Sequence, residues 1–514
     1  MRDLLLALTL AAAFGPGEPQ ADEAAPPRPN VVVILADDLG FSDLGCYGSE
    51  IATPRLDALA ARGLRFTQFY STAKCENSRI SLLSGLYANQ AGGKQLTRAA
   101  SFAEVLRGAG YSTAMVGKWH LSGSPLDFGF ERYWGHLSGA TNFFTGDDSF
   151  RLGREVWPVP EELGGRPFYT THATADFAIE FLDAMRAEES PFLLYVAFNA
   201  PHYPLHAPKA DVEAQAGRYD AGWDALRAAR HRRQLESGLM PARWKLSPRP
   251  DHVPAWTTLT EEEQRWEARR MEVFAAMVSV LDGSVGRIVD HLEQHELLED
   301  TLILFSSDNG ACPFERTKGS EHAPWDPRSY WTYDVGWAHV GNTPFRLYKQ
   351  NQHEGGISVP LIAHWPAGLV REAGSIERQP AHLIDVMATC LELSGGSYPE
   401  SVGERVVDPL QGRSLLPLLR GAERAGHEQL YFRFGRDRAL RQGKWKLVSA
   451  KLGRWELYDL EADRSELNDL AAEEPERTES MRKEWHRLAA ELDRLEGKAL
   501  QRVKKKLAKL PFRR

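Results

Sequence analysis

Two apolar segments of the chain end in acidic or amide side chains that could bind a cation. "VVVILADD" ends in Asp37 and Asp38, and "TLILFSSDN" ends in Asp308 and Asn309. Three carboxylates in one place repel one another unless a cation or shared protons offset their charge, and hard oxygen ligands suit Ca²⁺ or Mg²⁺. Acids of this kind also cap a following loop or helix. Because two segments end alike, we expect one cation site.

Basic side chains follow other apolar segments in the same way. Lys118 and His120 lie in "VGKWH", and His202 lies in "NAPHYP". A lone histidine is usually structural, but two histidines and a lysine facing a cation site favour an anion-binding pocket with proton transfer. Lys349, before "QNQHEGGISVP", would add a second fixed positive charge. An exposed surface lysine is the alternative interpretation of Lys349.

The segment "AKCENSRISLLSGLY" places a cysteine, Cys75, four residues before Arg79. The helical spacing after it puts Cys75 at or near a helix N-terminus, where free N–H groups and the helix dipole favour an anion. Arg79, one turn on, could hold a nucleophile or clamp an oxyanion. This arrangement suits hydrolysis of a sulfate or phosphate ester, with a cation neutralising the transferred group.

The elements that must position these residues alternate between buried strands and helices. The run from Val31 to Leu35 is continuously apolar, as a strand buried on both faces would be. Further strands are predicted from Ser112 to Val116 and within "SPFLLYVAFNAPHYP", "DTLILFSSDNG" and "SVPLIAHWP". "TPRLDALAARG" predicts a helix with Thr53 as N-cap, Pro54 at its first position and Gly63 as its stop. The alternation predicts an open α/β sheet, which binds ligands beyond the carboxyl ends of its strands.

Both terminal segments differ from this pattern. Residues 1–25 have one early arginine, a short Leu/Ala core and then small and Pro/Gly/acidic residues. This predicts a cleaved signal peptide and linker, and therefore export to a periplasm or the exterior. The apolar run is too short to span a bilayer, so no stable membrane insertion is expected. Residues 425–514 predict a small C-terminal antiparallel-sheet subdomain with a closing charged helix over roughly residues 474–497.

Composition and charge narrow the function further. The chain has 514 residues in globular proportions and a formal net charge of -8, which argues against a nucleic-acid partner. Its four cysteines show no CxxC pair, so they indicate neither a zinc site nor a disulfide scaffold. Cys46 and Cys390 are expected to be buried free thiols. The basic run "RVKKKLAKLPFRR" is expected to be a solvated helix end.

Motifs in a fixed order give the chain a family resemblance. From about Pro29 to about Leu470 it resembles the formylglycine-dependent sulfatases of the alkaline phosphatase superfamily. The motifs are "PNVVVILADDLGFSDLGCYG", "TPRLDALAARGLRFTQFY", the Cys75–Arg79 segment, "MVGKWHLS", "APHYPLHAP", "LFSSDNG" and "NTPFRLYKQNQHEGGISVPLIAHWP". "DAGWDALRAARHRRQLESGLMP" and "ELYDLEADRSELNDLA" are similar to the arylsulfatase branch. The resemblance implies an α/β fold, with a large mixed, mostly parallel sheet flanked by helices, and a catalytic domain over residues 29–422.

The resemblance also implies a role for each candidate residue. In that family a maturation enzyme oxidises the motif cysteine to formylglycine, whose hydrate supplies the nucleophilic oxygen, and Cys75 occupies that position. The residues matching the ligands of one Ca²⁺ ion are Asp37, Asp38, Cys75, Asp308 and Asn309. The residues matching those that stabilise the hydrate, bind sulfate and protonate the leaving oxygen are Arg79, Lys118, His120, His202 and Lys349. The implied substrate is a sulfated small molecule or glycan.

The chain departs from the usual family motif at Asn77. That motif is Cys-x-Pro-x-Arg or Cys-x-Ala-x-Arg, whereas this chain has "CENSR". Three consequences stay open: lower conversion by the maturation enzyme, a different maturation system, or a thiol that is never modified.

Two other functions fit the same residues. A phosphodiesterase or phosphonate monoester hydrolase would keep the fold and change the ester, because the Lys118/Lys349 pair suits a compact anion of either type. A glycan-binding relative without formylglycine would bind sulfated sugars in Ca²⁺ with no turnover. Aromatic residues in "DAGWD" and "WTYDVGWAHV" would either stack on a substrate ring or pack in the core.

Overall fold

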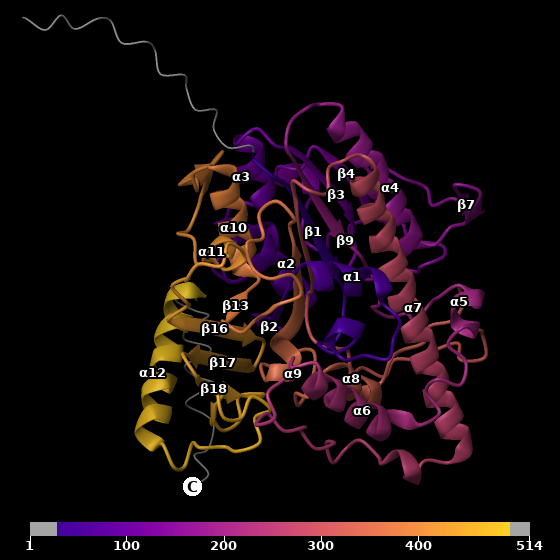
Figure 1. The fold of residues 1–514 in the computed structure, drawn as a ribbon, viewed down its shortest axis with the longest axis vertical. Helices are drawn as coiled ribbons and strands as arrows, with labels where there is room; N and C mark the ends of the chain where they lie inside the picture. Colours follow the sequence, from indigo (N-terminus) through magenta and orange to yellow (C-terminus); the bar gives the residue numbers. More distant parts are fainter. Residues whose placement is uncertain (1–27, 494–514) are drawn as a thin grey trace, which may run out of the picture.

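The protein is built on one large mixed sheet with helices on both faces and a smaller sheet at its side (Figure 1). A computed structural model describes residues 28–493. In spatial order the strands of the large sheet are β12 Ile376–Glu377, β2 Leu64–Tyr70, β11 Ser358–His364, β10 Thr301–Ser307, β1 Asn30–Ala36, β9 Phe192–Ala197, β3 Ser112–Gly117, β4 Arg132–His136, β5 Phe150–Leu152 and β6 Glu155–Val156. A further short strand, β13 Ala381–His382, also pairs with β2.

The centre of the large sheet is parallel and its flanks are not. The strands from β10 through β1, β9 and β3 to β4 all run parallel. Strand β11 is antiparallel to both of its neighbours, and β5 is antiparallel to β4. The prediction of a mixed, mostly parallel sheet is therefore confirmed.

Strand β1 shows why this sequence forms the middle of the sheet. The side chains of Val32 and Ile34 belong to the core on one face, and those of Val31 and Val33 belong to the core on the other. Successive side chains of a strand point to opposite faces, so a strand covered on both sides must be apolar at every position. The unbroken apolar run from Val31 to Leu35 meets this requirement.

Helices cover both faces of the sheet. One face carries α1 Pro54–Arg62, α4 Thr170–Arg186 and α7 Glu261–Gln294, and the other carries α2 Cys75–Ser84, α3 Phe102–Gly108 and α10 Ile384–Ser394. Shorter or peripheral helices are α5 Lys209–Glu213, α6 Gly222–Glu236, α8 Val335–Gly341, α9 Glu354–Ile357 and α11 Leu416–Leu419. Two small hairpins are formed by β7 Glu162–Leu163 with β8 Arg166–Pro167 and by β14 Ser401–Val402 with β15 Arg405–Val406.

Helix α1 begins and ends where the sequence predicts, but its first turn is capped from elsewhere. Thr53 is the N-cap residue and Gly63 follows the last turn, yet the Thr53 side chain accepts no hydrogen bond from the helix backbone. Asp282 of α7 accepts the N–H groups of Arg55 and Leu56 instead, at 3.1 and 2.8 Å. A residue more than two hundred positions away therefore supplies the cap.

The C-terminal part is an antiparallel sheet of β16 Gln429–Phe434, β17 Asp437–Gln442, β18 Trp445–Ser449 and β19 Glu456–Asp459. Leu440 and Leu447 pack against Trp485 of α12 Pro475–Leu492, which covers the outer face of this sheet (Figure 1). Ala439 and Val448 belong to a separate core cluster that includes residues of the large domain. The predicted helix thus exists over Pro475–Leu492, and residues 494–497 of its predicted span lie outside the described residues.

Buried charges also join the two parts. The Glu354 carboxylate at the start of α9 accepts hydrogen bonds from Lys446 Nζ and Arg464 Nε, each at 2.8 Å. All three side chains are at most 1 % exposed. Because a buried charge without a partner is strongly destabilising, these contacts tie the small sheet to the large domain in one orientation.

The terminal segments fall outside residues 28–493. The predicted signal peptide and the basic run "RVKKKLAKLPFRR" both lie there, so they stay predictions. Among the described helices, none combines the length and the apolar character needed to cross a bilayer.

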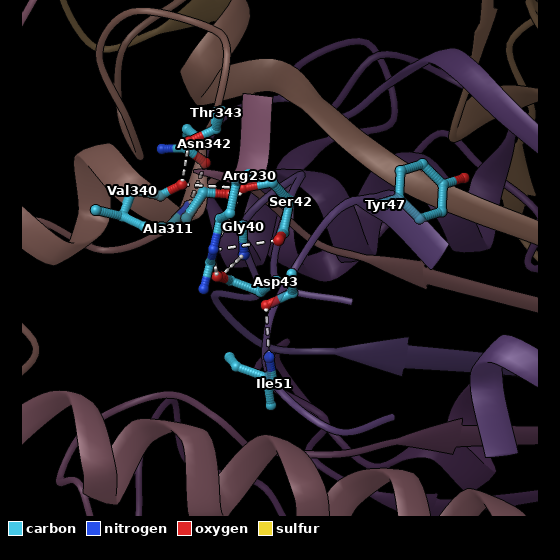
Figure 2. A network of polar contacts seen from close by, with 12 residues as sticks. Gly40, Ser42, Asp43, Tyr47, Ile51, Arg230, Ala311, Val340, Asn342 and Thr343 are labelled. Atoms are coloured by element: carbon cyan, nitrogen blue, oxygen red, sulfur yellow. Dashed lines mark hydrogen bonds and ion pairs between the residues drawn. The ribbon is translucent and has the colours of Figure 1, made fainter. Parts of the chain in front are cut away.

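A buried arginine of α6 holds the loop that follows β1 (Figure 2). Arg230 donates to the Asp43 carboxylate at 2.6 Å and to the Glu50 carboxylate at 2.8 Å. The second oxygen of Asp43 accepts the N–H of Gly40 at 2.8 Å. One guanidinium thus fixes the backbone only two residues after Asp38.

The same loop is attached to α8. The hydroxyl of Ser42 donates to the carbonyl oxygens of Val340 and Gly341, both at 2.9 Å (Figure 2). Asn342, directly after α8, accepts the N–H of Ala311. The segments following β1, β10 and α8 are therefore braced against one another.

We predict that Arg230→Ala destabilises the protein strongly. It removes the partner of Asp43, whose pKa is already raised by burial, and loss of one member of a buried ion pair costs about 3–5 kcal/mol. Denaturant-induced unfolding measures the effect. Arg232→Ala is the matched control, because its pair with Glu236 on the same helix is exposed and should contribute less than about 1 kcal/mol. Similar losses in both variants would contradict this account of the loop.

Candidate active site

Four polar side chains meet at the carboxyl ends of β1 and β10. The two strands are parallel neighbours, with Ala36 opposite Ser307, so the residues that follow each strand emerge at the same edge. The four side chains, all at most 1 % exposed, are those of Asp37, Asp38, Asp308 and Asn309. The N–H of Asp38 donates to Asp308 at 3.2 Å, and the Asn309 amide donates to Asp38 Oδ1 at 2.6 Å.

Each of the three carboxylates has a buried cation of the chain beside it. Lys349 Nζ lies 2.5 Å from Asp38 Oδ1, and Arg79 Nη2 lies 3.1 Å from Asp308 Oδ2. Lys118 Nζ forms an ion pair with Asp37 Oδ2. Repulsion among the acids is therefore offset by the chain itself, which the sequence analysis did not anticipate. Lys349 is 2 % exposed, so the alternative of an exposed surface lysine is wrong.

Three oxygen atoms of these four side chains have no hydrogen-bond partner among residues 28–493. They are Asp37 Oδ1, Asp38 Oδ2 and Asn309 Oδ1, all buried. Buried polar atoms are normally paired, and hard oxygen donors are the ligands that Ca²⁺ and Mg²⁺ prefer. Donor atoms of Asp37, Asp38, Cys75 and His202 lie within 4.8 Å of one another. The free oxygen atoms of Asp37, Asp38 and Asn309 fit a divalent cation.

The charges of the cluster shift the pKa values of its acids in opposite directions. Burial opposes ionisation of Asp37, but the charges of Lys118 and Arg79 hold its pKa well below the usual range. Burial likewise opposes ionisation of Asp38, and Lys349 lowers its pKa. Burial and the neighbouring Asp37 raise the pKa of Asp308 to about 7. Asp308 is thus the carboxylate whose charge would gain most from a bound cation.

Cys75 is the first residue of α2 and points into this cluster. Its Sγ lies 3.0 Å from Lys349 Nζ and 3.8 Å from Asp38 Oδ1. Burial raises the pKa of the thiol to about 12. The thiolate is the reactive form of cysteine, so the unmodified side chain is a poor nucleophile at neutral pH.

Arg79, one turn after Cys75, ties α2 to two strand ends. Besides Asp308, its guanidinium donates to the carbonyl of Lys118 at 3.0 Å. Lys118 directly follows Gly117, the last residue of β3, where φ is +95° and a Cβ atom would lie 2.1 Å from the Ala197 carbonyl oxygen. Only glycine fits there, and it lets β3 approach β9 closely before the lysine turns into the site.

The two histidines occupy different places. His202, after β9, has Nε2 3.5 Å from Asp38 Oδ2 and Nδ1 2.6 Å from the carbonyl oxygen of Tyr203. Burial lowers the pKa of His202 to about 4, so the ring is neutral and its Nδ1–H donates to that carbonyl. His120 lies at the edge of the cluster, with Nε2 3.6 Å from Glu76. Burial and the charges of Lys118 and Arg79 lower the pKa of His120.

Glu76 is a residue of this site that the sequence analysis did not single out. Its carboxylate lies between His120 and Lys94 Nζ, the latter at 2.9 Å. It occupies the first turn of α2, next to Cys75. Its position directly after Cys75 is the only feature of the sequence that could have pointed to Glu76.

The structure also tests the expectations for the aromatic rings and for two of the cysteines. The rings proposed for stacking on a substrate, Trp223, Trp331, Tyr333 and Trp337, are all buried in the core on the face covered by α4 and α7. Their alternative role, core packing, is therefore the observed one. Cys390 is buried as expected, whereas Cys46 is only partly buried, so that expectation was wrong for Cys46.

Comparison with known proteins adds the family. The sequence profile of the Sulfatase family matches residues 29–396, and the profile described as N-sulphoglucosamine sulphohydrolase, C-terminal, matches residues 345–495. The chain belongs to the sulfatase family. This sulfatase is 33% identical over 488 residues to an uncharacterised sulfatase of Schizosaccharomyces pombe, covering 83% of this chain and 86% of the relative. It is 32% identical over 436 residues to an arylsulfatase of Klebsiella aerogenes, covering 77% of this chain and 93% of that arylsulfatase.

Solved structures agree with this assignment. The crystal structure of Ps i-CgsB in complex with k-i-k-neocarrahexaose matches this sulfatase with a TM-score of 0.65 and 25% identity, over 90% of this chain and 92% of that chain. The sulfatase therefore has the alkaline phosphatase-like fold that the resemblance implied, and it is a sulfuric ester hydrolase.

Proposed function

We propose that this sulfatase hydrolyses its ester through a formylglycine made from Cys75, beside one bound Ca²⁺ ion. The observation that carries the proposal is the position of Cys75. It stands at the N-terminus of a ten-residue helix, in contact with Lys349 and Asp38, beside carboxylates that keep free oxygen atoms.

A modified Cys75 accounts for the burial of the residue better than a thiol does. A thiol with its pKa raised to about 12 would be slow to attack, and transfer of the sulfo group to sulfur would leave no easy route to water. Formylglycine, when present, supplies a hydrate with one hydroxyl to attack sulfur and a second whose deprotonation re-forms the carbonyl and expels sulfate. The N–H groups of α2 and the guanidinium of Arg79 would stabilise negative charge on the attacking oxygen.

The charge balance of the site fits a calcium ion and a singly charged ester. The ligands would be Asp37, Asp38, Asp308, Asn309 and the modified Cys75. Calcium, when bound, would neutralise charge on the transferred group. The three carboxylates already face three cations of the chain, so a divalent ion would leave the site positive and ready for an anion.

The remaining side chains then have separate tasks. Lys118 and Lys349 would bind the oxygen atoms of the sulfate group while staying paired with Asp37 and Asp38. His202 would take up a proton at Nε2 when the anionic ester binds, because its Nδ1–H is held on the carbonyl of Tyr203, and would pass it to the leaving oxygen. His120, held beside Glu76, would accept a proton from the second hydroxyl of the hydrate.

The substrate and the cellular context form part of the same proposal. We expect a sulfated sugar or an aryl sulfate, since the relatives include an arylsulfatase and a protein solved with a neocarrahexaose. Residues 1–25 would direct export, residues 29–422 would form the catalytic domain, and residues 425–514 the C-terminal subdomain. A formylglycine-generating maturation enzyme would be the partner that converts Cys75.

Removing one proposed ligand should remove the metal. In Asp308→Asn, bound calcium measured by elemental analysis should fall from about one ion per chain to a small fraction, and activity should be lost. Asp300→Asn is the control, because Asp300 is exposed and precedes the other end of β10. Equal calcium content in Asp308→Asn and the unchanged protein would overturn the ligand assignment.

The proposed acid should matter most for poor leaving groups. His202→Ala should lower kcat/KM for aryl sulfates with poor leaving groups by about 10²-fold or more, and much less for activated esters. His206→Ala is the control, because its Nε2 contacts the Ser329 carbonyl, and it should affect both ester classes alike. Equal losses across the series in His202→Ala would indicate sulfate binding only.

Mass spectrometry of the Cys75 peptide tests the nucleophile. We expect the aldehyde form at partial occupancy in a foreign host, and higher occupancy in Asn77→Pro. Asn77 is the third residue of α2, where no helical hydrogen bond is lost to proline, so the variant should fold. Active enzyme that carries only the thiol at Cys75 would contradict the proposal, while leaving the family and fold unaffected.

A further inference from the structure

Two histidines and a carboxylate meet where the last turns of α4 and α7 lie together. They are Asp183 near the end of α4, His291 in the last turn of α7, and His295, which caps α7. Figure 1 shows α4 and α7 side by side on one face of the sheet. None of these residues belongs to the candidate active site.

The trio lies at the opposite edge of the sheet from Cys75. The end of α4 leads directly into the start of β9, and the end of α7 leads into the start of β10. The candidate active site is built beyond the other ends of these same strands. A ligand held by the trio would therefore not touch the sulfate ester.

The three side chains bring their donor atoms close together. His291 Nε2 lies 3.1 Å from Asp183 Oδ1, and His295 Nε2 lies 4.0 Å from the same oxygen. All three donor atoms lie within 4.8 Å of one another. Residues four apart on a helix share one face, and the two imidazole rings lie 4.5 Å apart between centroids.

The short contact between His291 and Asp183 is not an ordinary hydrogen bond. His291 Nε2 is buried and makes no hydrogen bond of normal geometry with any residue in the described part of the chain. A neutral imidazole carries a lone pair on one of its two ring nitrogens. That pair can be directed at a metal ion placed between the three side chains.

We propose that Asp183, His291 and His295 form a second metal site, selective for Zn²⁺ or a similar borderline transition metal. In a tetrahedral site with ligands at about 2.0–2.1 Å, neighbouring donor atoms are about 3.3 Å apart. The observed separations need only small side-chain rotations to reach that value. Water would complete the coordination. Two imidazoles disfavour Ca²⁺, which takes oxygen ligands, so the two metal sites of this chain would not compete.

One cation of the chain competes for the carboxylate. Arg186 Nη2 lies 3.4 Å from Asp183 Oδ1. This arginine is about half exposed, with 46% of its side chain accessible, so it can move into solvent when the metal binds. Bound zinc would then join α4 to α7 and stabilise both helices. These helices lead into β9 and β10, the strands that His202 and Asp308 follow.

Zinc titration of the full-length chain tests this site. The protein is prepared without a polyhistidine tag and kept in excess Ca²⁺, and binding is measured by calorimetry and by the visible absorption of Co²⁺ as a substitute. We expect one zinc ion per chain with micromolar affinity or better, and a higher Tm on binding. Asp183→Asn and His295→Ala should each weaken binding by at least about tenfold and abolish the rise in Tm. His172→Ala, a histidine of α4 outside the trio, should bind like the unchanged protein.

Arg186→Ala separates metal binding from mere structural support. If the trio binds zinc, removal of the competing guanidinium should tighten binding severalfold, whereas a purely structural contact would show no such gain. The inference is overturned if zinc does not bind, or if zinc binds equally to Asp183→Asn, His295→Ala and the unchanged protein. A Co²⁺ spectrum without tetrahedral bands would also overturn it.

Discussion

The pairing of β1 with β10 imposes the constraint on which the rest of this structure depends. Because these strands are parallel neighbours, their final residues emerge together and bring Asp37, Asp38 and Asp308 into one buried volume. Buried carboxylates of like charge strongly disfavour one another. Other parts of the chain offset this repulsion by delivering positive charge to the same place.

The positive charges arrive from three separate elements. Arg79 comes from the second turn of α2, Lys118 from the end of β3, and Lys349 from the loop that follows α8. Each must be positioned to within a few tenths of an ångström, since charge-assisted hydrogen bonds weaken steeply with distance and angle. The buried Arg230 and the contacts of Ser42 brace the loops that carry Asp38 and Lys349. Buried polar contacts outside the site therefore help to position the groups within it.

Because the chain balances its own charges here, a divalent ion bound at this site would leave it positive and ready for an anion. The three acids are each paired with a cation of the chain. Asp37, Asp38 and Asn309 still have oxygen atoms without a hydrogen-bond partner among the described residues, and a bound cation would lie next to these atoms. Cys75 lies at that side of the cluster, at the positive end of α2. A group attached there would face an electrostatic field already arranged to hold negative charge.

The amino-acid sequence by itself determined the elements and the inventory of chemical groups. Unbroken apolar runs such as Val31 to Leu35 require burial on both faces, and polar residues placed directly after such runs must lie at one edge of a parallel sheet. The ordered motifs likewise implied the family.

Only the tertiary structure decided which charges pair. Each cation lies far along the chain from the acid that it pairs with. The burial of a side chain also depends on which distant segments pack over it. The sequence therefore could not distinguish Lys349 from a surface lysine, or Trp337 from a ring that stacks on a substrate. The capping of α1 by Asp282, the link between Glu76 and His120, and the meeting of Asp183 with His291 and His295 follow the same rule. Local sequence patterns determine the secondary structure and the chemical group at each position. Contacts between segments far apart in the sequence determine which other groups surround it.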